Sequence, residues 1–278
     1  MPFDTGSVND PHTFAAANGL QYDPVAGHPP LGGALFEFLS ATTVTDRFRS
    51  TSGRELEIGS IRGTVGGGQK RQEGAWTVTT SYSTTTVRSY GYMAMQLDRA
   101  LPHIVLDARS NGSSIPMPIG GGQKLSLEGD FDRHFRLYCP RGYETDALYI
   151  MTPDLMALLV DETGDFDVEI VDDMLYVYAT TPFDVRDPAL WERLGRIRDV
   201  VGAKALRQTD FYTDDRVGDR AANVVGDGGR RLRMGFLGGG TKKMLILFVA
   251  VFGVVFLFIG GVAFFILSRM ADLVSTIP

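Results

Sequence analysis

The chain has 278 residues and a formal net charge of −6 at pH 7. An acidic chain lacks the basic footprint of a nucleic-acid-binding protein, so we expect no nucleic-acid partner. Its one cysteine, Cys139, excludes an intramolecular disulfide, and the length suits one large domain or two small ones.

Residues 1–34 contain five prolines and many small or polar residues, a composition typical of a flexible arm. His12 and His28 lie in this arm without a cysteine nearby, and we expect no metal site there. The domain is predicted to follow this arm and to cover residues 35–205.

Residues 35–205 predict an α+β domain with a mostly antiparallel sheet of about seven strands and two or three helices. Runs rich in Thr, Val, Tyr and Trp indicate strands at 75–83 and 88–97. Further strands are expected at 103–109, after a proline, and at 134–139. Residues 167–181 predict a hairpin with its turn at Asp172–Asp173.

Two helix starts carry the same signal, a capping side chain followed by proline. Thr152 precedes Pro153, and Asp187 precedes Pro188; proline at the first helical position sacrifices no hydrogen bond. In the second helix Leu190, Leu194, Ile197 and Val201 follow at spacings of 4, 3 and 4, which predicts one buried face.

The chemical motifs of the domain are weak. GGGQK occurs at 66–70 and 120–124, but it lacks the spacing and the following helix of a phosphate loop, so we interpret both copies as hairpin loops. His134 and Cys139 are five positions apart, which places them on opposite faces of a strand. We therefore predict no catalytic residue, no cofactor and no metal site, and interpret Cys139 as a structural thiol.

Residues 206–243 lose all periodicity and predict a juxtamembrane linker rich in Gly and Arg. Its basic residues, together with the lysines next to the following apolar stretch, are expected to contact anionic lipid headgroups. These residues are Arg230, Arg231, Arg233, Lys242 and Lys243.

Met244–Leu267 has no charged, amide or hydroxyl side chain over 24 residues, which is long enough to cross a bilayer as one transmembrane helix. Five basic residues precede it and only Arg269 follows, so residues 1–243 are expected in the cytoplasm and the tail 268–278 outside. Ala250, Gly253 and Gly260 share one face of this helix and are candidates for packing against another helix.

One long stretch, FDRHFRLYCPRGYETDALYIMTPDLMALLVDETGDFDVEIVDDMLYVYAT, resembles an uncharacterised family of actinobacterial membrane-associated proteins. Tyr149, Thr152, Pro153, Tyr176 and Tyr178 carry the resemblance, which extends over about residues 54–205 with the upstream YGYMAMQLDRALPHIVLDAR. The family has no established activity to transfer, and the C-terminal position of the span differs from the N-terminal spans of many of its members.

The sequence favours a non-enzymatic, membrane-tethered binding or accessory protein, because no acid–base, metal or nucleophile pattern is present. Its expected partners are the lipid bilayer, a membrane or cytoplasmic protein, and a second copy through the span. Two alternatives stay open. One is an enzyme whose site is assembled from scattered Asp, His and Tyr residues, and the other is a module that binds lipid headgroups.

Overall fold

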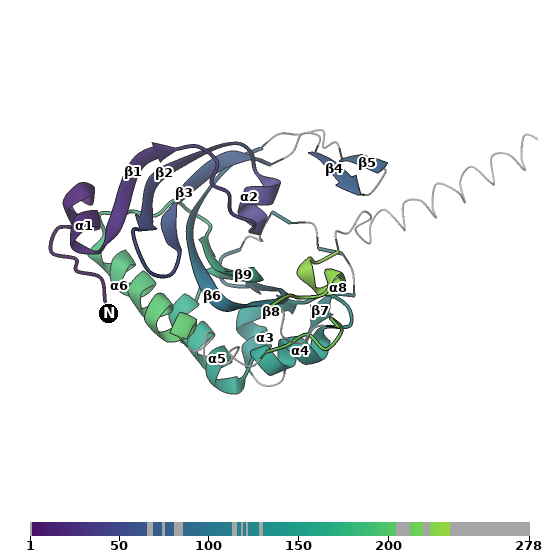
Figure 1. Ribbon diagram of the computed structural model, residues 1–278. Helices are drawn as coiled ribbons and strands as arrows, with labels where there is room; N and C mark the ends of the chain where they lie inside the picture. Colours follow the sequence, from purple (N-terminus) through teal and green to yellow (C-terminus); the bar gives the residue numbers. More distant parts are fainter. Residues whose placement is uncertain are drawn as a thin grey trace, which may run out of the picture. The chain divides into compact units, whose positions relative to one another are not determined.

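One long, bent strand organises the fold in the computed structural model (Figure 1). The structure describes residues 2–65, 69–73, 76–80, 86–112, 116–117, 119–120, 122–127, 130–203, 212–218 and 223–233. The chain divides into two units, Met1–Met234 and Gly235–Pro278, and all described residues belong to the first. Within them no helix is both long and apolar enough to cross a bilayer, and the predicted span Met244–Leu267 lies outside them.

The bent strand is β6 (Thr86–Ala108), and it has neighbours along both edges. β9 (Asp167–Ala179) pairs with it along one edge, whereas β3 (Leu56–Val65) and β8 (Phe135–Tyr138) share the other. β2 (Ser40–Ser50) and β1 (Leu20–Ala26) extend the sheet from β3, and β7 (Lys124–Leu125) extends it from β8. All pairs are antiparallel, which confirms the predicted seven-stranded, mostly antiparallel sheet. β4 (Gln69–Glu73) and β5 (Trp76–Thr80) form a separate two-stranded sheet.

The strands β6 and β9 differ from the prediction at their bend. The predicted hairpin over 167–181 is wrong, because Asp172 adopts a positive φ of 51° inside one continuous strand rather than in a turn. The separate strand predicted at 103–109 is also wrong. Pro102 lies where the β6–β9 register shifts, so its missing N–H is not needed by the ladder. Two strand halves at an angle are thus joined by a bulge.

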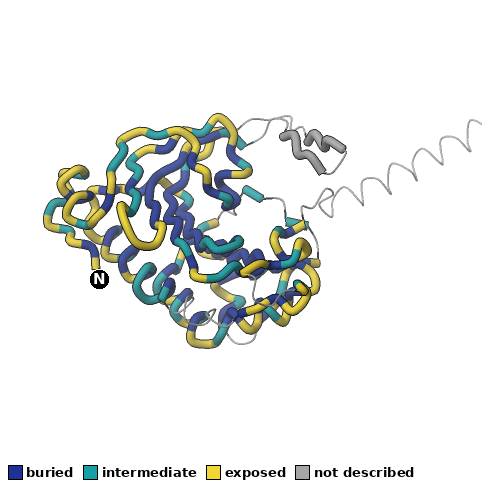
Figure 2. Tube along the Cα trace, in the orientation of Figure 1, coloured by how far each residue is buried: buried dark blue, intermediate teal, exposed yellow. Residues whose placement is uncertain are grey.

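Alternate residues of the sheet face two different layers. One face packs against most of the helices, and the other, which we call the α2 face, carries Tyr90, Tyr92, Tyr176 and Tyr178 and is covered by α2 (Ala34–Phe38). The helices of the first layer are α1 (Pro11–Ala17), α3 (Phe131–His134), α4 (Glu144–Ile150), α5 (Pro153–Leu158) and α6 (Pro188–Arg196), with π-helical turns η1 (Leu159–Thr163) and η2 (Ile197–Gly202). Buried residues concentrate in the strands between these layers (Figure 2).

Both predicted helix starts are confirmed. Thr152 accepts a hydrogen bond from the N–H of Leu155, and Asp187 accepts one from Ala189, each with proline at the first helical position. In α6 and η2 the predicted apolar face includes Leu194, which is fully buried. With α8 (Asp227–Arg230), the described residues contain seven α-helices, more than the two or three expected, because most are too short to show a period.

The predicted flexible arm over 1–34 is wrong for the described residues. Phe3 and Phe14 pack on Trp191, with ring centroids 5.3 and 4.3 Å from it. The prolines that suggested a loop occupy regular positions, since Pro11 begins α1 and Pro24 lies on the edge strand β1. These aromatic side chains complete the core, which therefore begins well before residue 35.

Candidate functional site

Four titratable side chains are buried on the α2 face, where the two halves of the sheet meet. They are His103 and Asp107 from β6 and Asp167 and Glu169 from β9, which are 2, 4, 3 and 1 % exposed. The register pairs Val105 with Glu169 and Leu106 with Val168, so the polar residues alternate with apolar residues that face the helices. Strand geometry therefore gathers charges from two distant parts of the sequence.

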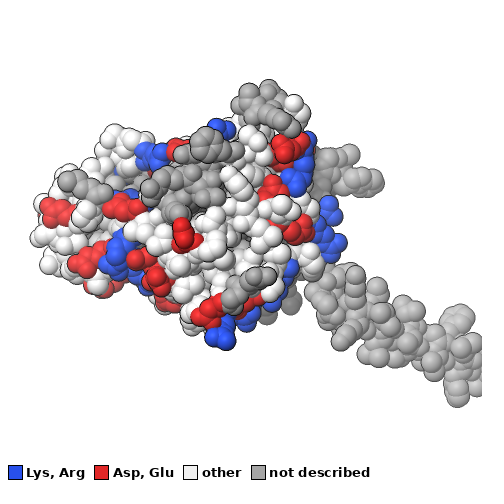
Figure 3. Space-filling view, turned by 90° about the horizontal axis from the view of Figure 1, so that it is seen from below, with Lys and Arg blue, Asp and Glu red and all other residues white. Residues whose placement is uncertain are grey.

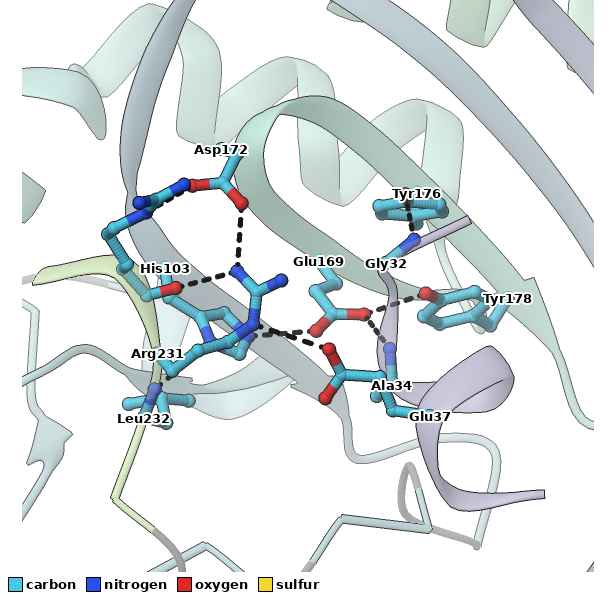
Figure 4. Close-up of polar contacts among 11 residues, drawn as sticks. Gly32, Ala34, Glu37, His103, Glu169, Asp172, Tyr176, Tyr178, Arg231 and Leu232 are labelled. Carbon is cyan, nitrogen blue, oxygen red and sulfur yellow. Dashed lines mark hydrogen bonds and ion pairs between the residues drawn. The ribbon is translucent and has the colours of Figure 1, made fainter. Parts of the chain in front are cut away.

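Glu169 contacts His103, Tyr178 and the backbone of Ala34 (Figure 4). Its Oε2 accepts hydrogen bonds from Tyr178 Oη and from the N–H of Ala34, each at 2.7 Å, and its Oε1 lies 2.8 Å from His103 Nε2. Burial alone would raise the pKa of Glu169, but the hydrogen bonds from His103, Tyr178 and Ala34 outweigh it and the pKa is lowered. Glu169 is therefore a buried carboxylate anion whose oxygens are both satisfied.

The hydrogen bonds of His103 assign its tautomer. Its Nδ1 accepts a hydrogen bond from the backbone N–H of Leu232 at 3.0 Å, so Nδ1 carries no proton. Nε2 then carries the proton and donates a hydrogen bond to Glu169. The imidazole is neutral in this arrangement and links β9 to a segment more than a hundred residues away in sequence.

That segment, residues 223–233, packs against the domain, and we call it the strap. The prediction of a linker over 206–243 is therefore wrong for these residues. Arg231 forms ion pairs with Asp172 at 3.0 Å and with Glu37 at 3.4 Å, and Arg230 pairs with Asp172 at 3.2 Å. The side chain of Leu232 is buried beside the tyrosines. The strap and α2 thus cover the cluster from two directions.

Of the residues expected to contact lipid headgroups, Arg230 and Arg231 have these acidic partners in the domain. Arg233 is held by its backbone, because its N–H donates to Gln123 Oε1 and its carbonyl accepts from Gln123 Nε2. Lys242 and Lys243 lie outside the described residues, as do Ala250, Gly253 and Gly260. Headgroup contact stays a prediction for all five residues.

The second GGGQK segment was predicted to be a hairpin loop, but its glutamine forms part of the strap's binding surface. The Gln123 side chain is buried, and the N–H of Gly120 donates to the carbonyl of Arg233 at 2.8 Å. Gly122 has a φ of 78°, and a Cβ there would collide with Arg141. The first copy lies partly outside the described residues.

A second buried contact holds the other end of the strap. Tyr143 Oη donates to Asp214 Oδ2 at 2.8 Å, and the N–H of Gly226 donates to the same oxygen at 2.9 Å. The guanidinium of Arg216 lies over the Tyr143 ring and also pairs with Asp146. The strap is thus fastened at Gly226 and again at Arg231–Arg233.

A second group of charged residues lies next to Glu169. It forms a row across three neighbouring strands, with Arg136 on β8, Asp107 on β6 and Asp167 on β9. Arg136 Nη1 donates to Asp107 Oδ2 at 2.8 Å, whereas Asp107 Oδ1 has no hydrogen-bond partner among the described residues. Burial, reinforced by the neighbouring Asp107, raises the pKa of Asp167 to about 7. One carboxyl group of the row therefore carries a proton near neutral pH.

The chemical possibilities of these groups are limited by their burial. His103 with Glu169 has the composition of a general base, but its polar atoms are all engaged by the protein. Burial raises the pKa of the Cys139 thiol to about 11, which supports its interpretation as structural. No group of three metal-ligating side chains occurs within the described parts of the chain. A surface cavity of about 670 Å³ lies elsewhere, at Asp146, Tyr149, Tyr212 and Arg216.

Comparison with known proteins identifies no family. No family model matches the sequence, and no curated protein matches it. Among solved structures, the crystal structure of the mycobacterial trehalose monomycolate transport factor A, TtfA, is similar over 73% of this chain and 92% of that chain, with 10% identity and a TM-score of 0.43. A similarity at this level does not identify an activity.

Proposed function

We propose that this chain is a membrane-anchored, non-enzymatic binding or accessory protein, with Met244–Leu267 as its transmembrane helix and the domain in the cytoplasm. The length and composition of the apolar segment support the anchor, and the basic residues before it support the orientation. The observation that carries the accessory role is the docking of the strap. Ion pairs to Asp172 and Glu37 and the hydrogen bond from Leu232 to His103 hold it against the domain, and the buried polar groups face no open cavity that the structure describes.

The tether is the part of the chain between the packed domain and the proposed transmembrane helix. Docking of the strap determines how long this tether is. A free linker over 206–243 would reach about 130 Å when extended, whereas the ten residues after Arg233 reach about 35 Å. A short tether keeps the domain close to the bilayer and raises its effective concentration for any membrane partner. The ion pairs of the strap are partly exposed, so each contributes little to stability, and the backbone hydrogen bonds of Leu232 and Arg233 determine where the strap lies.

An enzyme remains the second candidate, because His103 and Glu169 form the His–carboxylate pair that such a site requires. Access to this pair would require the strap or α2 to move. Recognition of headgroups by the domain itself is less well supported. On the face shown in Figure 3, acidic and basic side chains are interspersed, and no basic patch forms.

Cysteine labelling tests the topology. Cys139 is buried, so it gives little background in the folded protein. A cysteine introduced as Ser275→Cys should react with an impermeant thiol reagent added to intact cells, and one introduced as Thr209→Cys should not. Labelling in the reverse order would contradict the proposed orientation.

Crosslinking in membranes followed by affinity purification tests the accessory role. The full chain should recover a specific protein partner, and Arg231→Glu should reduce that recovery, because it places an acid beside Asp172 and Glu37 and lengthens the tether. Arg133→Glu, at an exposed pair with Asp130, is the matched control. Turnover of a generic substrate panel by the purified chain, abolished by His103→Gln, would instead favour the enzyme.

Self-association through the span belongs to the same proposal. Small residues allow two helices to approach closely in lipid. Gly253→Ile combined with Gly260→Ile should reduce the signal of a membrane dimerisation reporter, and Val254→Ile should leave it unchanged. Equal signals from all three would leave the span as an anchor without a packing role.

A further inference from the structure

One contact of the strap uses an unprotonated nitrogen as its acceptor. The N–H of Leu232 donates to Nδ1 of His103, and this contact lies between the ion pairs of Arg231 and the backbone bonds of Arg233. A proton on Nδ1 would remove the acceptor and turn two N–H groups toward each other. Histidine is the side chain that most readily takes up a proton between pH 5 and 8.

The charges around His103 differ between its two sides. β9 presents Glu169, which accepts from Nε2 and from Tyr178, with Asp167 and Asp172 farther along on either side. β6 itself presents Asp107 on the same face. α2 presents Glu37, and the strap presents Arg231, which pairs with Glu37 and Asp172. A protonated imidazole would keep its bond to Glu169 but would repel the guanidinium of Arg231.

We propose that protonation of His103 at Nδ1 releases residues 230–233 of the strap from the domain while the β6–β9 core stays folded. The proton comes from solvent, the hydrogen bond from Leu232 is broken, and the imidazolium remains paired with Glu169. The domain then stays attached through Gly226, and the covalent tether beyond it lengthens. This inference concerns contacts within Met1–Met234, so it does not depend on the proposed membrane anchorage.

Hydrogen exchange of the full chain in detergent measures the release directly. The peptide containing 230–233 is compared at each pH with a reference peptide from β9, Leu175–Tyr178, in the same sample, which removes the intrinsic pH dependence of exchange. Between about pH 7.5 and about pH 5.5, the protection of the strap relative to the reference should fall about tenfold or more. A constant ratio over this range would overturn the proposal.

His103→Gln is the matched variant. A glutamine amide can donate to Glu169 and accept from Leu232 but does not titrate in this range, so the strap should stay protected at both pH values. A fall equal to that of the wild type would overturn the proposal. If this variant fails to fold, Arg231→Gln replaces it. Protection should then be lower at pH 7.5, and the difference between the two pH values should be smaller because one repulsive charge is gone.

Asp167 needs its own control because its pKa of about 7 falls inside the pH interval of the experiment and it lies on the same face. Asp167→Asn removes that titration but leaves His103 and its partners in place. The variant should show the same pH-dependent fall in strap protection as the wild type. Loss of the fall in Asp167→Asn would assign the effect to the carboxyl row and overturn the role of His103.

Discussion

Replacement of Glu169 by glutamine tests whether the cluster is an ionic network. The variant keeps the size of the side chain and one acceptor oxygen, but its NH₂ group must face one of the three donors that Glu169 now satisfies. If it faces Nε2 of His103, two donors meet. The other tautomer of His103 would remove that clash but would then oppose the N–H of Leu232.

The expected cost follows from burial. Glu169 and His103 are almost completely buried, so solvent cannot replace the lost interaction. A hydrogen bond to a charged group contributes about 1.5–3 kcal/mol, and Glu169→Gln removes the charge from the acceptor of three such bonds. A buried donor left without an acceptor alone costs about 1–3 kcal/mol. We therefore expect Glu169→Gln to lower the free energy of unfolding by about 3 kcal/mol, a large part of the 5–15 kcal/mol typical of a domain.

Urea unfolding followed by tryptophan fluorescence is a suitable assay, because Trp191 is buried against Phe3 and Phe14. Glu162→Gln is the control. Glu162 pairs with a largely exposed Arg196, and its loss should cost less than about 1 kcal/mol. The double variant Glu169→Gln with His103→Gln should be less unstable than the sum of the two, because paired amides satisfy each other. A cost for Glu169→Gln no larger than that of Glu162→Gln would refute the ionic network.

Three further predictions concern other parts of the domain. Asp167 has a folded-state pKa of about 7, above its ordinary value of 3.8, so the stability gained from its bound proton is lost as the pH rises from about 4 through about 7. Asp167→Asn should remove this pH dependence and raise the urea midpoint at pH 8, and an unchanged profile would contradict the shift. Gly33→Ala should lower the melting temperature, because the added Cβ would collide with Tyr178 Oη and cost about 1–3 kcal/mol, whereas Gly27→Ala, with open space around it, should be neutral. Leu194→Asp should leave little folded protein by circular dichroism, since it places an unpaired charge in the core, and a near-native melt would show that α6 does not pack as described.

The parts of the fold that the sequence predicted depend on local signals. The caps at Thr152 and Asp187 are contained within four and three residues, and the face that includes Leu194 repeats with the period of a helix. The wrong predictions lie where contacts between residues distant in sequence determine the local structure. Asp172–Asp173 has the composition of a turn, yet the pairing of β6 with β9 continues through it and makes it a bulge. The proline and polar residues in 1–34 have the composition of a loop. The burial of Phe3 and Phe14 follows from their packing on Trp191, which is distant in sequence.

The candidate site was missed because its partners are distant in sequence. His103 and Asp107 interrupt one apolar run, and Asp167 and Glu169 interrupt another. Charged residues at even spacing inside otherwise buried strands are a usable signal, since a strand buried on both faces must satisfy them with partners. That signal could have identified the strands but not the strap, because a Gly- and Arg-rich segment has the composition of a free linker.

The two segments that cover the α2 face lie near opposite ends of the domain, and this has a consequence during synthesis. Gly32–Ala34 is made early, but Arg231–Leu232 is made about 200 residues later, so His103 lacks one of its hydrogen-bond partners until then. Contacts between such distant residues form late and slowly. Met244 follows Leu232 by only twelve positions. Docking of the strap and the emergence of the apolar segment from the ribosome therefore fall close together in time, and a delay in docking leaves the α2 face partly uncovered while a strongly apolar segment is also exposed.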